Sequence, residues 1–120
     1  MNKRAVQNTK RRGVLRFFIY FDQADKEFVG VCVDLGIIKT DNDPYRLKQD
    51  LENAALGYVE IVYKNKLPDY LLNQKPPKKY LDIFQDILSA IEAKEKSRYR
   101  VDLNETQTFF RSVKDLCPAC

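Results

Sequence analysis

The sequence predicts an α+β fold, in which a three- to four-stranded, mainly antiparallel sheet carries one long helix on a face. Residues 14–40 hold short runs of branched and aromatic residues separated by polar turns, as strands do. Residues 44–64 repeat apolar side chains every three to four positions, as an amphipathic helix does. A chain of 120 residues, 44% of them hydrophobic, can bury the core of one such domain without disulfides or a metal.

Three successive strands are expected in the first part of the domain. Large apolar side chains occupy alternate positions of residues 14–21, namely Leu15, Phe17, Ile19 and Phe21. After a polar turn at residues 22–26, residues 27–33 predict a second strand, which forms a hairpin with the first. Residues 36–40 predict a short third strand. Gly30, inside the second strand, indicates a bulge or a close neighbouring backbone.

The long helix is predicted over residues 44–64. Asp43 suits the N-cap and Pro44 the first helical position. One apolar face follows, made of Leu47, Leu51, Ala54, Ala55, Tyr58, Val59 and Val62. Gly57 weakens the helix by about 1 kcal/mol relative to Ala, and its small size would let a strand or a second subunit approach closely. Helix and sheet together form a sandwich of two layers.

The rest of the chain is expected to be mostly helical. Residues 67–72 predict an irregular segment or a short edge strand, and residues 78–96 predict a second amphipathic helix. Residues 99–103 alternate like a brief strand. Residues 105–116 predict a short final helix, with three side chains inward: Phe109, Val113 and Leu116. The chain then divides into a basic disordered tail (1–12), an α+β domain (13–75) and a helical C-terminal extension (76–120).

The net charge of +4 comes from the N-terminal segment. Residues 1–12 contain no acid and five basic residues, Lys3, Arg4, Lys10, Arg11 and Arg12, so the remainder carries −1. These side chains are the candidates for nucleic-acid binding. The alternative is a solvated terminus that aids solubility. We favour the second interpretation because the segment has no aromatic residue to stack on bases.

The chain contains no histidine, which excludes His-dependent catalysis and imidazole metal ligands. Cys117 and Cys120 form one Cys-Pro-Ala-Cys pair, whereas a structural zinc site needs four ligands. Cys32 lies in an apolar run and is expected to be a small buried hydrophobe. Three cysteines favour a reducing, cytoplasmic compartment over a disulfide scaffold. No apolar run is long enough to span a bilayer, no secretory signal is visible, and no cofactor or metal is expected.

Residues 28–36, Phe-Val-Gly-Val-Cys-Val-Asp-Leu-Gly, are followed by an acidic turn at residues 40–44 and by Leu-Lys-Gln-Asp-Leu-Glu-Asn-Ala at residues 47–54. This succession resembles the HicB-like antitoxin domain over about residues 14–75. In that family a strand closes on a "pDLpG" turn, and the following helix typically contains "EAL-ENA". Asp34-Leu35-Gly36 matches the turn without its prolines, and residues 51–55 match the helix.

The resemblance implies a partial RNase H-like sheet without nuclease activity. It also implies that the protein binds a small, basic, HicA-like toxin that cleaves mRNA, and covers the toxin's active surface. Many family members bind operator DNA through a C-terminal ribbon-helix-helix or helix-turn-helix segment. Here the residues after Tyr99 provide one predicted strand and one short helix, fewer elements than a ribbon-helix-helix needs. We therefore expect residues 78–120 to be an interaction or dimerisation extension instead.

Four aspartates could in principle supply RNase H-type metal ligands: Asp22, Asp34, Asp41 and Asp43. Three are explained more simply as turn or helix-cap residues, and only Asp34 ends a strand. We therefore expect no catalytic residue, no metal site and no enzyme. Asp34, Asp41 and Asp43 are expected instead to present negative charge to a basic partner.

Three hypotheses about function follow. The first is an antitoxin-like protein that neutralises a HicA-type toxin, with autoregulation of its operon as an added role. The second is a nucleic-acid-binding transcriptional regulator without a toxin partner. The third, ranked last, is an RNase H-like nuclease. The aromatic content and the second amphipathic helix further predict a homodimer or homotetramer.

Overall fold

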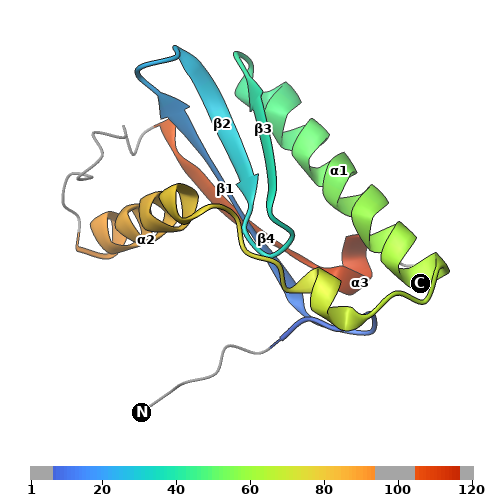
Figure 1. Cartoon of the computed structure of the whole chain (residues 1–120). Helices are drawn as coiled ribbons and strands as arrows, with labels where there is room; N and C mark the ends of the chain where they lie inside the picture. The colour runs from blue at the N-terminus through green and yellow to red at the C-terminus, as the bar shows by residue number, and fades with distance from the viewer. Residues whose placement is uncertain (1–6, 94–104, 117–120) are drawn as a thin grey trace.

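Four antiparallel strands form one sheet in the order β3-β2-β1-β4 (Figure 1). The strands are β1 (Val14–Asp22), β2 (Glu27–Cys32), β3 (Ile37–Asp41) and β4 (Gln107–Ser112). The computed structural model describes residues 7–93 and 105–116. The first three strands form a meander close to the predicted ranges, and the predicted α+β class is confirmed.

Helices cover both faces of this sheet. Figure 1 shows α1 (Pro44–Lys64) on the right of the sheet and α2 (Lys78–Ala93) on the left. The short elements η1 (Asp69–Leu72) and α3 (Val113–Leu116) close the lower end. The expectation of two layers is therefore wrong, since helices cover both faces of the sheet. Successive side chains of β1 point to opposite faces, and both are apolar. Phe17 belongs to the core on the α1 side and Phe18 to the core on the α2 side.

The core between the sheet and α1 is the larger of the two. Asp43 caps α1 as predicted, because its carboxylate accepts hydrogen bonds from the Tyr45 and Arg46 N–H groups. The buried residues of this core come from β1, β2, the β2–β3 turn, α1, η1 and α3: Leu15, Phe17, Cys32, Leu35, Leu51, Ala55, Val59, Val62, Leu72 and Val113.

The second core lies between the sheet and α2. Its buried residues are Phe18, Tyr20, Val29, Val31, Val33, Ile83, Phe84 and Ile87. The rings of Phe18 and Phe84 stack with centroids 4.9 Å apart. The predicted helix at residues 78–96 is observed over Lys78–Ala93, and its last positions lie outside the described residues.

The segment predicted as a final helix is mostly a strand. β4 pairs antiparallel with β1, placing Phe109 opposite Phe17, and the two rings stack with centroids 4.8 Å apart. Only α3, four residues long, is helical. The spacing of Phe109, Val113 and Leu116 suits a helix, but pairing with a distant strand decides the conformation. Residues 105–116 therefore complete the sheet and are not a helical extension; the strand predicted at 99–103 lies outside the described residues.

Residues 7–12 are also part of the fold, which corrects their expected disorder. The Asn8 side chain is buried, accepts a hydrogen bond from the Val14 N–H and donates one to the Leu72 carbonyl. Asn73 accepts from the Asn8 N–H and donates to the Asn8 carbonyl. A buried amide with several partners fixes the chain that carries it, so these residues are held against η1.

The two glycines differ from their predicted roles. A Cβ built on Gly30 would lie 3.1 to 3.3 Å from side-chain atoms of Leu47 and Leu51, so the close neighbour is α1 and not another backbone. A Cβ on Gly57 would meet nothing within 4 Å, so the expected close approach is not observed there. Within the described residues, no helix is long and apolar enough to cross a membrane.

Candidate interaction surfaces

Asp34, the aspartate that follows β2, forms an internal ion pair. Its carboxylate accepts hydrogen bonds from the Arg16 N–H (2.7 Å) and from the Arg16 Nη2 (2.9 Å) and Nε (3.3 Å). Asp34 is about one-tenth exposed, whereas the Arg16 side chain is nearly half exposed. The carboxylate therefore fixes β1 to the β2–β3 turn and presents little charge outward.

Asp41 and Asp43 lie at the opposite end of β3, in the turn that starts α1. The two Asp41 oxygens each accept a hydrogen bond of 2.7 Å from Arg46, and Oδ1 also accepts one from the Asp43 N–H. These bonds favour the charged carboxylate and lower the pKa of Asp41 to about 2. Asp41 therefore stays ionised at physiological pH while organising the helix start.

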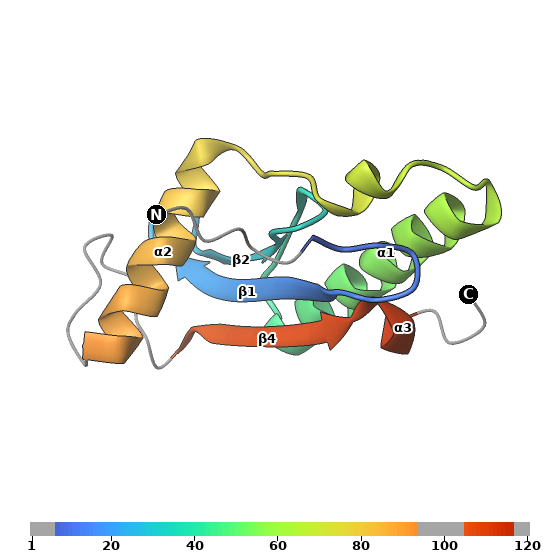
Figure 2. The same ribbon diagram turned by 90° about the horizontal axis from the view of Figure 1, so that it is seen from below.

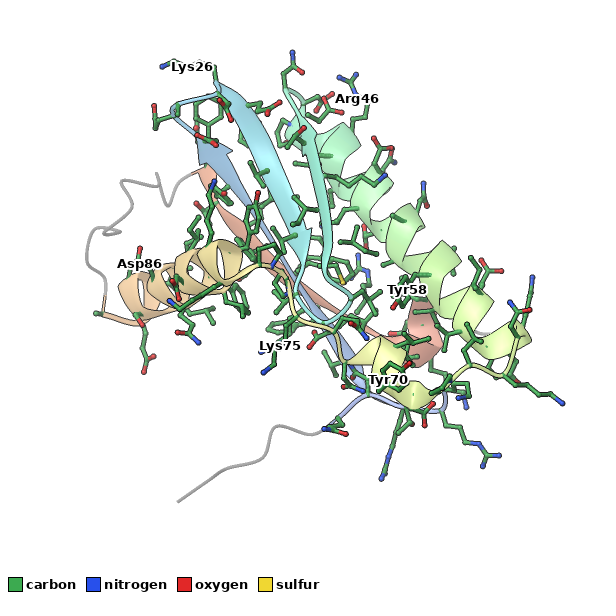
Figure 3. The ribbon with its side chains drawn as sticks, viewed as in Figure 1. Lys26, Arg46, Tyr58, Tyr70, Lys75 and Asp86 are labelled. Atoms are coloured by element: carbon green, nitrogen blue, oxygen red, sulfur yellow. The ribbon has the colours of Figure 1, made fainter. Side chains whose placement is uncertain are left out.

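The register of the strands brings further acids to this end. Asp22 pairs with Glu27, and Phe28 pairs with Asp41, so the β1–β2 turn and the β3–α1 turn lie at the same end of the sheet. We call this end the acidic end, defined by the carboxylates of Asp22, Asp25, Glu27, Asp41 and Asp43. Two cations, Lys26 and Arg46, also lie there (Figure 3), so the net charge of this set is −3.

Sequence reasoning grouped these acids incorrectly. The sequence predicts that Asp34 acts together with Asp41 and Asp43, yet the length of β3 separates it from them. The acidic end instead includes Asp25, in the predicted turn, and Glu27, at the start of the second strand. The predicted hairpin contained the missing signal, because three consecutive antiparallel strands bring the first turn and the residues after the third strand to one end.

The four candidate metal ligands do not converge. Asp22 accepts hydrogen bonds from the Ala24 and Asp25 N–H groups, as a turn residue does. Asp41 and Asp43 organise the start of α1, and Asp34 lies at the other end of the strands. In residues 7–93 and 105–116, no three Asp, Glu or Cys side chains form a group that could hold a metal ion.

Three basic residues of the N-terminal segment, Lys10, Arg11 and Arg12, precede β1 at the end of the sheet opposite the acidic end. Lys10 Nζ donates to Asp69 Oδ1 (2.7 Å) and to the Leu67 carbonyl (2.6 Å), and the ion pair lowers the pKa of Asp69. This contact places the exposed Arg11 and Arg12 beside the segment that follows α1. Lys3 and Arg4 lie outside the described residues.

The Cys32 thiol is fully buried, and burial raises its pKa to about 12. It therefore stays protonated and behaves as a small core residue, as the sequence predicts. Cys117 and Cys120 lie outside the described residues. Comparison with protein-family models, with curated proteins and with solved structures gives no match for this chain.

Proposed function

We propose that this chain is an antitoxin-like interaction module, which binds and neutralises a small, basic, HicA-type mRNA-cleaving toxin. The observation that carries the proposal is the acidic end of the sheet, where two turns gather five carboxylates and two cations. One of the five, Asp41, is largely buried and paired with Arg46, so the other four carry the outward charge. A surface of one sign of charge attracts a partner of the opposite sign and speeds their association.

The proposal does not require catalysis by this chain. The carboxylates that would be needed for a nuclease site have structural partners: Asp34 binds Arg16, Asp41 binds Arg46, and Asp43 caps α1. The resemblance of residues 28–54 to the HicB-like domain gives the partner's class. The three cysteines, one of them buried and unpaired, fit a reducing compartment, so we place the protein in the cytoplasm.

Co-expression with the product of the adjacent short reading frame tests the proposal. We expect that frame to encode a small basic protein, and the two chains to elute as one complex of summed mass in size-exclusion chromatography with mass detection. A partner that is not basic, or two chains that elute separately, would contradict the proposal.

A double charge-reversal variant then tests whether the acidic end is the surface that binds the partner. D25K with E27K changes the acidic end and should slow association several-fold at low salt, because the steering field is reversed locally. The matched control, E60K with E92K, makes the same change in net charge on two helical positions away from the acidic end. Glu92 is exposed, and Glu60 is half-buried with Lys64 as its partner. Equal rates for the two double variants would assign the binding to another surface.

Nucleic-acid binding is a second candidate, and one observation favours it. Lys10 binds the Leu67 carbonyl and Asp69, next to the exposed Lys66, and the exposed Arg11 and Arg12 follow Lys10 in the chain. Filter binding on duplex DNA across salt concentrations measures the number of phosphate contacts. The five tail cations predict a log–log slope of roughly −4, at about −0.9 per phosphate, and R11A with R12A should flatten it by about 2. Binding without salt dependence would rule this role out.

A further inference from the structure

Within the described residues, β4 is an edge strand, and its outward backbone groups have no partner strand. Val33 donates to the Arg16 carbonyl, so even-numbered residues of β1 bond to β2. Val113 donates to the Gly13 carbonyl, so odd-numbered residues bond toward β4. Because antiparallel pairs alternate in this way, the backbone N–H and C=O groups of Thr108, Phe110 and Ser112 point away from the sheet.

The side chains of β4 do little to block a further strand. Its sequence, Gln-Thr-Phe-Phe-Arg-Ser, contains one charge and no proline. Arg111 Nε binds Glu52 on the α1 side, and Arg111 Nη1 donates to the Phe110 carbonyl (3.3 Å), a contact that a pairing strand would have to replace. Phe110 lies on the other face and is 57% exposed. Natural edge strands are normally protected by charges, prolines, bulges or a covering element. An exposed aromatic edge is therefore a candidate interface.

We propose that two copies of this chain pair antiparallel through β4, about a two-fold axis at Phe110, to form one continuous eight-stranded sheet. An axis perpendicular to the sheet keeps the faces in register, so Phe110 lies opposite Phe110 of the second copy. Thr108 then lies opposite Ser112, and Phe109 opposite Arg111. No like charges face each other across the junction, and each pair suits a cross-strand contact.

The position of α2 on the sheet supports this pairing of the two β4 strands. Figure 2 shows α2 crossing one end of the sheet, from the side of β2 to the side of β4. Its flank residues Leu88 and Ile91 are 40% and 47% exposed. On the same face, at the other end of β1, Val14 is 49% exposed. Val14 pairs with Ser112 within one copy. In the proposed dimer, Ser112 lies opposite Thr108 of the second copy, and Thr108 lies at the end of the sheet that α2 crosses. Each α2 would therefore extend toward the uncovered apolar end of its neighbour.

The other edge of the sheet does not offer the same fit. β3 has only five residues, its Lys39 and Thr40 side chains are exposed, and Asp41 at its end binds Arg46. A short edge with a lysine disfavours pairing. The second copy is therefore assigned to β4 and not to β3.

Sedimentation of the 120-residue chain tests the assignment, with one proline variant for each edge strand of the sheet. The outward N–H of Phe110 is not needed by the sheet, so F110P removes a backbone bond and the aromatic contact of the dimer but no hydrogen bond within the sheet. In β3, Gly30 bonds to Lys39, which leaves the Thr40 N–H outward, and T40P is the matched control. We expect a dimer for the wild type and T40P at tens of micromolar, and at least about tenfold weaker association for F110P.

F110E provides a second variant that keeps the backbone donor, and it should weaken the dimer by like-charge repulsion at the axis. Thermal unfolding at low concentration, where the chain is monomeric, verifies that each variant folds. A wild type that sediments as a monomer at tens of micromolar, or a dimer that survives both F110P and F110E, would overturn the proposal.

Cross-linking tests the register itself, in a C117S/C120S background. F110C should form a disulfide-linked dimer on mild oxidation, because paired positions on neighbouring strands lie within disulfide reach. T108C alone should not cross-link, whereas a mixture of the T108C and S112C chains should. Cross-linking of T108C to itself, or failure of F110C, would show that the two-fold axis does not lie at Phe110.

Discussion

The two faces of the sheet are covered to different extents. On the α1 side a 21-residue helix, η1 and α3 together enclose a core that includes Leu15, Phe17 and Val113. On the α2 side a 16-residue helix crosses one end of the sheet, and Val14 and Phe110 remain about half exposed (Figure 2). The difference indicates that the α1 face buries the larger core, and that the exposed apolar side chains of the α2 face are those that the proposed dimer would cover.

The largest effect that can test this comparison is a cavity in the α1 core. Leu51 is fully buried, so L51A should lower the free energy of unfolding by about 2–5 kcal/mol in urea denaturation. I61A is the control on the same helix, because Ile61 is 58% exposed, and it should change stability by less than about 0.5 kcal/mol. Similar losses for both variants would mean that α1 does not pack on the sheet as described.

The two glycines sharpen the account of the α1 face. G30A places a methyl group against Leu47 and Leu51 and should destabilise the protein by about 1–3 kcal/mol. G57A adds a methyl group in open space on the helix and should stabilise by up to about 1 kcal/mol. Opposite signs in thermal denaturation are the expected result. A neutral G30A would show that α1 lies farther from β2.

Asn8 tests whether the N-terminal segment belongs to the fold. Removing its buried amide leaves the Val14 N–H and the Leu72 carbonyl without a partner, so N8A should cost about 1–3 kcal/mol. R11A changes an exposed neighbour and should leave the unfolding midpoint unchanged. If N8A is also neutral, residues 7–12 are a tail after all.

The smallest expected effect concerns acid stability at the start of α1. The folded-state pKa of Asp41 is about 2, below the usual value of 3.8, so its contribution to stability is present above pH 4 and is lost as the pH falls toward 2. D41N should therefore be less stable than the wild type at neutral pH, with a difference that shrinks across this window. A difference that is constant between pH 5 and pH 2 would assign the effect to packing.

Sequence reasoning predicted the meander and α1 because their signals are local. Alternation over residues 14–21 and the Asp43-Pro44 helix start lie within a few residues of the elements they specify. β4 was missed because its apolar spacing fits a helix, and only its pairing with β1, about ninety positions earlier, makes it a strand. The Asp34–Arg16 ion pair was missed for the same reason.

The acidic end could be predicted from the sequence only in part. Its composition is visible in the sequence, and the hairpin register would have placed Asp22, Asp25 and Glu27 beside Asp41. The N-cap role of Asp43 and the turn role of Asp22 could be predicted, whereas the ion pairs of Asp34 with Arg16 and of Asp41 with Arg46 could not. Charge could therefore be predicted, while its availability to a partner could not.

The association rate with the small basic product of the adjacent reading frame tests the central claim most directly, when it is measured at low and at high salt. The account predicts fast association at low salt, slowed by salt and by D25K with E27K, but not by E60K with E92K. A rate that neither salt nor the acidic-end variant changes would contradict the claim that this end of the sheet receives the partner.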